Sequence, residues 1–228
     1  MRDFFHYCDN YIDAVDRAAE HYAGGLTGEM RPGVISRLRE RGIRVEFAQT
    51  GALRVFDPER KVLTLSSLAP PETQSFQLLV QVALLRQNDL LEATLDLARF
   101  QSDAARAIAK LGLANYFAGA AMMPYSRFLA AAQEARHDLE LLASRFGASI
   151  EQVAHRLSTL QRPGAKGIPF FFARVDQAGT ITKRHSATRL QFARFGGACP
   201  LRNVHQRKET DHELLQRRQR RQLMWTRI

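Results

Sequence analysis

The 228-residue sequence contains only two cysteines, Cys8 and Cys199, which lie far apart in the chain. This scarcity argues against a small domain held together by a disulfide framework and fits the reducing cytoplasm. No apolar run approaches the roughly 20 residues that a membrane-spanning helix needs. The first residues are charged and polar rather than those of a secretion signal. The sequence therefore predicts a cytoplasmic protein with no membrane segment.

Acidic residues are scarce in the last third of the chain. Residues 162–228 contain 15 of the 33 Lys and Arg but only 4 of the 23 Asp and Glu, whereas residues 1–161 contain 18 and 19. The formal net charge of +10 is therefore entirely carboxy-terminal. Such a concentrated positive field can attract nucleic acid, an anionic membrane, or a ligand with several phosphates such as a nucleotide or coenzyme A. Charge alone does not choose among these partners.

Helical periodicity dominates the first 160 residues. Apolar residues at helical spacing predict helices over 5–23, 34–41, 72–113 with a break at Asn88–Asp89, 114–122, 137–145 and 150–160. The last of these helices has a well-marked start, since Ser149 and Gln152 have the spacing of a capping box. Short apolar runs between residues 45 and 65, separated by turn residues, predict a small antiparallel meander.

Strand character returns after residue 167. Residues 168–175 are rich in aromatic residues, and turn residues at 176–179 separate them from residues 180–184, which predicts a β-hairpin. Residues 206–228 have no stable apolar period and are expected to form a solvated helix or a disordered arm. The fold class is α+β and mostly helical. We expect three parts, over residues 1–160, 161–205 and 206–228.

Several motifs together resemble a known family. They are Ala114–Tyr125 (ANYFAGAAMMPY), Phe146–Ser149 (FGAS), Leu160–Gly164 (LQRPG), Pro169–Phe172 (PFFF), and Arg194–Gly197 (RFGG) with Cys199–Leu201 (CPL). This set resembles the short-chain fatty acyl transcriptional regulators, whose central part is a metallopeptidase-like domain of the ImmA/IrrE type. The resemblance covers roughly residues 1–205.

The resemblance implies an Xre-type regulator with an amino-terminal helix-turn-helix, a peptidase-like region and a carboxy-terminal region that senses acyl-CoA. This chain is expected to begin after the helix-turn-helix. Past His205 the basic tail stands where the family has more cysteines. A truncated gene copy, a frameshift or a dissected fragment would each explain both differences. The resemblance therefore implies an effector-sensing region without its own DNA-reading module.

Peptidases of the related group hold zinc with a helical H-E-x-x-H motif, whose Glu activates water. When Phe76–Leu79 is aligned with the helix that carries this motif, Val80, Gln81 and Leu84 stand where His, Glu and His are required. The resemblance also places a carboxylate ligand shortly before Ala114, and residues 110–113 contain none. We therefore predict no catalytic residues and no enzyme activity.

Two further features have ordinary structural explanations. Cys199 and His205 are weak candidates for metal ligands, because structural zinc normally has four ligands and no partners accompany them. The helix pair within residues 137–160 is similar in outline to a DNA-reading helix-turn-helix, but Asp138, Glu140 and Glu151 would repel phosphates. A buried thiol at Cys199, a surface imidazole at His205 and a packing role for the helix pair explain these features more simply.

A coenzyme A thioester needs cations for its phosphates and an apolar slot for its acyl chain. The candidate ligand-binding residues are Tyr125, Arg156, Arg162, Lys183 and Arg184. For each one separately, a solvated surface cation or a packed tyrosine ring is the ordinary alternative. No cofactor is required, and the expected effector is a short-chain acyl-CoA.

The predicted function is effector sensing in a bacterial regulator of fatty acyl metabolism. The alternatives are a catalytically dead peptidase-like scaffold or nonfunctional remnant, and an active zinc peptidase of the ImmA/IrrE type. The expected partners are acyl-CoA, DNA through a separate helix-turn-helix or weakly through the basic tail, and a second copy of the chain.

Overall fold

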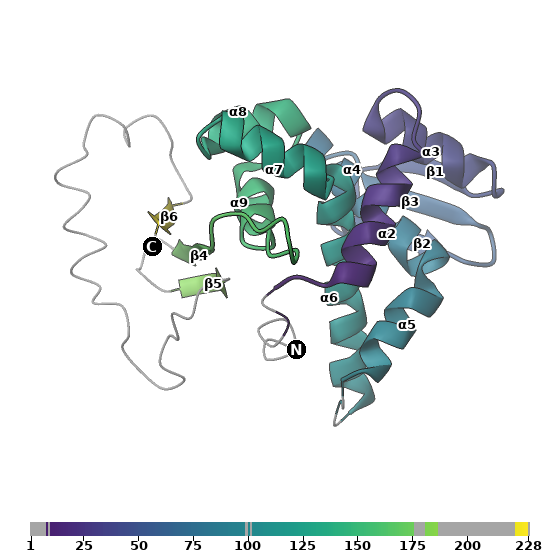
Figure 1. Ribbon diagram of the computed structural model, residues 1–228. Coiled ribbons are helices and arrows are strands. Elements are labelled where there is room, and N and C mark those ends of the chain that lie inside the picture. The colour runs from purple at the N-terminus through teal and green to yellow at the C-terminus, as the bar shows by residue number, and fades with distance from the viewer. Residues whose placement is uncertain are drawn as a thin grey trace.

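Figure 1 shows the computed structural model of the protein, in which a largely helical body is followed by a second group of strands. The structure describes residues 8, 10–98, 100, 102–175, 181–186 and 222–227, and for most of the last three strands it describes the backbone alone. The mostly helical α+β fold class predicted from the sequence is confirmed.

The helical body is built around one long central helix. Its helices are α2 (Asp13–Gly24), α3 (Met30–Arg39), α4 (Pro71–Arg86), α5 (Asn88–Asp96), α6 (Asp103–Met122), α7 (Tyr125–Glu134), α8 (Leu139–Phe146) and α9 (Ile150–Leu157). Helices α2, α4, α5 and α9 all contact α6. Leu113, Phe117 and Ala121 of α6 are fully buried, so this helix forms the centre of the hydrophobic core.

Several helix boundaries match the sequence-based prediction. The chain breaks between α4 and α5 at Gln87, α6 ends just before Pro124, and α9 begins with the predicted capping box of Ser149 and Gln152. Helix α6 begins earlier than predicted, because the Ser102 side chain accepts a hydrogen bond from the Ala105 N–H and caps a new helix there. Helix α7 was not predicted.

The first sheet contains β1 (Arg44–Ala48), β2 (Arg54–Asp57) and β3 (Val62–Ser66) in the order β1-β3-β2. Strand β1 pairs with β3 in parallel, and β2 pairs with β3 in antiparallel orientation. The predicted antiparallel meander is therefore wrong, since the sheet is mixed and β1 and β2 are not neighbours. Short alternating runs separated by turns look the same in sequence whether or not consecutive strands pair.

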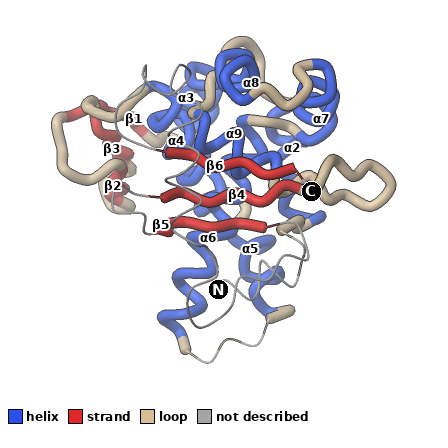
Figure 2. Tube along the Cα trace, turned by 90° about the vertical axis from the view of Figure 1, so that its left-hand side faces the viewer, coloured by secondary structure: helices blue, strands red, loops and turns tan. Residues whose placement is uncertain are grey.

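The second sheet contains β4 (Phe170–Val175), β5 (Ile181–Ser186) and β6 (Gln222–Arg227) in the order β5-β4-β6, with both pairings antiparallel (Figure 2). The predicted hairpin is confirmed as β4 and β5. The prediction of a helix or disordered arm is wrong for residues 222–227, which add a strand to the hairpin. The local arginine-rich pattern could not reveal this strand, because its partner lies about 50 residues earlier in the chain.

Within the described residues, no helix combines the length and the apolar character needed to cross a lipid bilayer.

Candidate functional site

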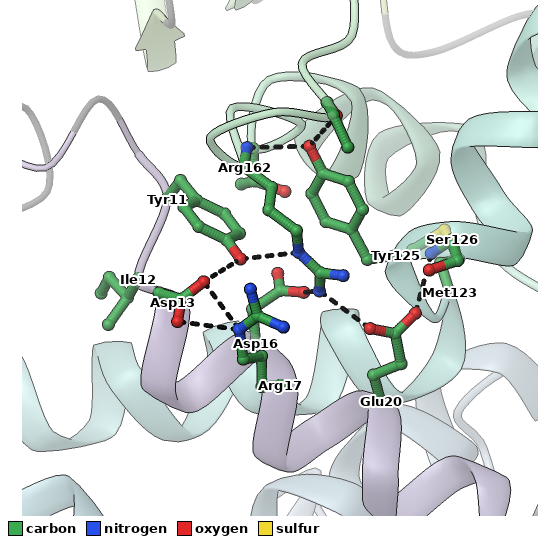
Figure 3. A network of polar contacts seen from close by, with 12 residues as sticks. Tyr11, Ile12, Asp13, Asp16, Arg17, Glu20, Met123, Tyr125, Ser126 and Arg162 are labelled. Carbon is green, nitrogen blue, oxygen red and sulfur yellow. Dashed lines mark hydrogen bonds and ion pairs between the residues drawn. The ribbon is translucent and has the colours of Figure 1, made fainter.

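A buried network of charged side chains lies where α2, the junction of α6 and α7, and the end of α9 meet (Figure 3). Its centre is Asp16 of α2, whose side chain is fully buried. Asp16 accepts hydrogen bonds from Arg156 Nη1 at 2.6 Å, Arg162 Nη2 at 3.1 Å and the Tyr116 hydroxyl at 2.8 Å. One carboxylate thus connects α2 with α6, α9 and the segment after α9.

Arg156 is the deeper of the two arginines. Its Nη1 and Nη2 atoms both donate to Asp16, its Nε donates to the Met123 carbonyl at 2.9 Å, and Nη1 also donates to the Thr159 hydroxyl. Burial lowers the pKa of Arg156, but the Asp16 carboxylate outweighs that effect and the net shift is upward. Arg156 is therefore a permanently charged internal partner of Asp16.

Arg162 lies nearer the surface of the same network. Its Nη2 donates to Asp16 and to Glu20 at 2.8 Å, its Nε donates to the Tyr11 hydroxyl at 2.8 Å, and its backbone N–H donates to the Tyr125 hydroxyl at 2.8 Å. Although burial lowers the pKa of Arg162, its bonds to Glu20 and Tyr11 raise it overall. Its Nη1 atom makes no hydrogen bond to any described residue.

Two tyrosine rings surround the Arg162 guanidinium. The guanidinium carbon lies 4.0 Å from the ring centroid of Tyr125 and 5.9 Å from that of Tyr11. The two rings meet edge to face at 5.6 Å. Burial raises the pKa of Tyr125, whose hydroxyl donates to the Ala165 carbonyl at 2.8 Å. The arrangement combines ion pairing, hydrogen bonding and cation–π contact on one side chain.

Glu20 extends the network to the amino terminus of α7. Its Oε2 accepts from Arg162, and its Oε1 accepts from the backbone N–H of Ser126 at 2.8 Å. Partial burial raises the pKa of Glu20, but the bonds from Ser126 and Arg162 outweigh it and hold that pKa below its usual value. Glu20 is thus ionised at neutral pH and connects α2, α7 and Arg162.

The structure brings together three of the five predicted ligand-binding residues. Tyr125, Arg156 and Arg162 meet in this network, with 1%, 3% and 8% of their surfaces exposed. The expectation that each cation is separately a solvated surface residue is wrong for the two arginines, because buried carboxylates hold them inside the protein. A role in ligand binding stays a prediction for all three.

The other predicted residues lie elsewhere. Lys183 and Arg184 are on β5, paired in register with Arg174 and Ala173 of β4. The weak metal candidates Cys199 and His205 lie outside the described residues, as does the expected turn over residues 176–179.

Sequence reasoning missed the acidic half of the network. Neither Asp16 nor Glu20 was among the predicted site residues. The available signal was that Asp16 is four residues after Ile12 and next to Val15, so that it lies on the apolar side of the helix. A carboxylate on an apolar helix face indicates a buried partner of opposite charge.

The positions of the peptidase motif are occupied by core residues of α4. Val80 is fully buried, Gln81 is 4% exposed and Leu84 packs against the core. Among the described residues, no group of three or more His, Cys, Asp or Glu side chains is placed to hold a metal ion.

Comparison with family models divides the chain near the end of α9. Residues 39–158 match the model described as "IrrE N-terminal-like domain". The chain belongs to the IrrE-like family. Residues 159–223 of this IrrE-like chain match the model "Short-chain fatty acyl coenzyme A regulator, C-terminal", so the predicted resemblance to the short-chain fatty acyl regulators is confirmed.

The relatives are regulators. The chain is 67% identical over 217 residues to a propionyl-CoA carboxylase regulator of Cereibacter sphaeroides, covering 94% of this chain and 47% of that protein. It is 44% identical over 212 residues to the HTH-type transcriptional regulator PrpR of Mycobacterium tuberculosis, covering 90% and 44%. A solved structure of a Mycobacterium tuberculosis transcriptional regulator superposes with a TM-score of 0.84 at 44% identity, covering 92% of this chain and 66% of that one. The chain spans about half the length of the curated relatives it matches.

The buried network lies at the boundary between the two matched regions, which falls between residues 158 and 159. Asp16 and Glu20 precede the IrrE-like region, Arg156 belongs to it, and Arg162 lies at the start of the acyl-regulator region. The network therefore joins the two matched regions and the segment before them through side chains about 140 residues apart in sequence.

Proposed function

We propose that this chain is the effector-sensing part of a bacterial transcription regulator of short-chain fatty acyl metabolism, with a short-chain acyl-CoA as its effector. The observation that carries the proposal is the match of residues 159–223 to the carboxy-terminal region of short-chain fatty acyl coenzyme A regulators. The match to a propionyl-CoA carboxylase regulator supports propionyl-CoA as the first effector to test.

Arg162 is the network cation with capacity left for an anionic ligand. Its Nη1 has no bonding partner in the described part of the chain, and its side chain is 10% exposed. A guanidinium edge suits a phosphate oxygen. Lys183 and Arg184 are proposed as further phosphate contacts from β5. Arg156 is proposed to contribute indirectly, because its buried bonds keep Asp16 and the end of α9 in place.

Isothermal titration calorimetry of the purified chain with propionyl-CoA and acetyl-CoA tests the proposal. We expect saturable binding of one ligand per chain, and weaker binding in a Lys183→Ala, Arg184→Ala double variant. A matched control is the double variant of the exposed cations Arg39 and Arg60 to Ala, which should bind as the unaltered chain does. Absence of binding by the unaltered chain would refute the proposal.

The second candidate function is a catalytically dead peptidase-like scaffold that binds another protein segment. The core residues Val80 and Gln81 at the motif positions favour it. No acyl-CoA binding together with a folded chain would support this candidate. The third, an active zinc peptidase, requires stoichiometric zinc and cleavage of a protein substrate, which zinc analysis and a proteolysis assay address.

We propose that the acyl-CoA signal reaches DNA through an attached or partner helix-turn-helix module. The basic carboxy-terminal region is proposed to add contacts to phosphates that do not depend on sequence.

A further inference from the structure

The two arginines of the buried network differ in how far they are exposed and in how many of their nitrogens bond to protein acceptors. Arg156 has a side chain that is 2% exposed and uses Nε, Nη1 and Nη2 in bonds to protein acceptors. Arg162 is 10% exposed, and its partner Glu20 is 26% exposed. Screening by water weakens an ion pair as its exposure rises. We therefore expect the Arg162–Glu20 pair to be the one that another anion can break, whereas the Arg156–Asp16 pair should remain intact.

Glu20 connects Arg162 to two helices, α2 and α7. It is on the penultimate turn of α2, and its second carboxylate oxygen accepts the N–H of Ser126 in the first turn of α7. Asp16, one turn earlier, also bonds Arg162 through Oδ1 at 3.1 Å. A change in the bonding of the Arg162 guanidinium thus alters contacts of α2 directly, and it alters contacts of α7 through Glu20.

An anion that approaches Arg162 Nη1 comes close to the Glu20 carboxylate, since both groups bind the same guanidinium. Arg162 already binds two carboxylates, Asp16 and Glu20, so a third anion at the same guanidinium adds repulsion that most easily displaces the more exposed of the two, Glu20. An effector phosphate and Glu20 are therefore competitors for Arg162.

We propose that α2 is the transmission element of this chain, and that an anionic effector exchanges with Glu20 for Arg162 and so loosens the last turns of α2 from the acyl-regulator region. The inference rests on the proposed function, because it assigns the regulation of the same site. Asp16 and Arg156 stay paired through the exchange and keep the helix attached. By reciprocity, whatever holds Glu20 on Arg162 weakens effector binding by the same factor.

The test compares Glu20→Gln with the unaltered chain in calorimetric titrations with propionyl-CoA. The glutamine is similar in size but carries no charge, so we expect the dissociation constant to fall by about fivefold, in the usual range of coupling between sites. Glu92→Gln is the matched control, because Glu92 also pairs with two cations, Arg106 and Lys110, in a different part of the molecule. E92Q should leave the dissociation constant unchanged.

Hydrogen exchange gives a second readout that does not depend on affinity. Propionyl-CoA should speed amide exchange over residues 20–24 in the unaltered chain and have no such effect in E20Q, where the contact is already lost. If urea unfolding shows that E20Q is too unstable to test, Glu20→Asp replaces it. This variant keeps the charge on a shorter side chain, and it should bind more tightly than the unaltered chain.

The outcomes separate the two proposals. Suppose that the unaltered chain binds propionyl-CoA, but that the dissociation constant of E20Q is unchanged or higher, or that amide exchange over residues 20–24 does not change. Either result would overturn the proposed displacement of Glu20 from Arg162 and leave the acyl-CoA function standing. Absence of binding by the unaltered chain would overturn both.

Discussion

At the scale of single residues, Asp16 stands out in the described part of the chain as a carboxylate with no exposed surface. A carboxylate removed from water loses several kcal/mol of solvation, and only well-placed cations and hydrogen bonds offset that loss. Asp16 has two guanidinium groups and one phenol around its two oxygens. Each carboxylate oxygen accepts from two donors, and the donors come from three different segments. We therefore expect the fold to depend on this side chain more than on an exposed ion pair.

Replacing Asp16 with asparagine should therefore destabilise the protein strongly. The substitution leaves Arg156 and Arg162 buried without full charge compensation, and breaking a buried ion pair in this way costs about 3 to 5 kcal/mol. Urea unfolding followed by circular dichroism measures the change in the free energy of unfolding.

The control for this experiment is Glu134→Gln, which breaks the pair with Arg145. The side chains of that pair are 50% and 69% exposed, so the loss should be below about 1 kcal/mol. Equal losses in the two variants would show that the buried network does not have the stabilising role assigned to it.

Glu20 should contribute to the acid sensitivity of the fold. Its pKa in the folded state lies below the usual value, despite partial burial, because Ser126 and Arg162 bond its charged form. A carboxyl with a depressed pKa contributes stability that is complete above its unfolded pKa and is lost as the pH falls through the folded one. The free energy of unfolding should thus fall as the pH drops below the usual pKa of a glutamate, and that of E20Q should fall less steeply. Parallel pH profiles of the two proteins, measured by urea midpoint, would contradict this assignment.

At the scale of elements, the corner between α8 and α9 shows how local sequence fixes the position of Arg156. Gly147 ends α8 in the left-handed conformation at φ 57°, which glycine adopts without strain. Two residues later the capping box of Ser149 and Gln152 starts α9. These two signals set the start of the short helix from which Arg156 reaches Asp16.

Removing the cap should weaken α9 measurably. Ser149→Ala deletes the acceptor for the Gln152 N–H and should lower the free energy of unfolding by about 1 kcal/mol. Ser36→Ala, at an exposed position inside α3, should change it by less than about 0.5 kcal/mol. Thermal or urea unfolding of both variants is the measurement. A loss at Ser36 as large as that at Ser149 would mean that capping is not the cause.

The same corner shows which parts of the fold can be predicted from sequence. Caps, turns and helix breaks depend on neighbouring residues, so the start of α9 and the end of α6 before Pro124 were predicted correctly. The parallel pairing of β1 with β3 and the addition of β6 to β4 depend on distant segments and leave no local periodicity. Arg156 and Arg162 were selected by residue type, whereas their common partner Asp16 is 140 and 146 residues away and could be found only through its place on an apolar helix face.

At the scale of the whole molecule, charge is divided unequally between two regions that match different family models. Residues 1–161 are close to neutral, and the excess lies within residues 162–228, most of which match the acyl-regulator model. The buried network connects the two regions but adds no net charge, because Asp16 and Glu20 balance Arg156 and Arg162. Any long-range attraction for polyanions therefore comes from the carboxy-terminal region.

Removing positive charge from the carboxy-terminal region should make DNA binding less dependent on salt. Deleting residues 206–228 would be a poor test, because residues 222–227 form β6 and their loss would expose an edge of β4. Replacing Arg217, Arg218, Arg220 and Arg221 with Gln removes four charges and keeps the strand sequence. If these side chains contact phosphates, the slope of log affinity for duplex DNA against log salt should become shallower by up to about 3.6, or about 0.9 per lost contact.

The matched control replaces four exposed arginines of the neutral region, Arg39, Arg41, Arg60 and Arg127, with Gln. It lowers the net charge by the same amount but removes no cation from the basic region. An equal change of slope in both variants would mean that net charge alone sets DNA binding, whereas a change confined to the carboxy-terminal variant would assign the contact to that region. Titration with propionyl-CoA should give the same dissociation constant in both, since neither set includes Arg162, Lys183 or Arg184.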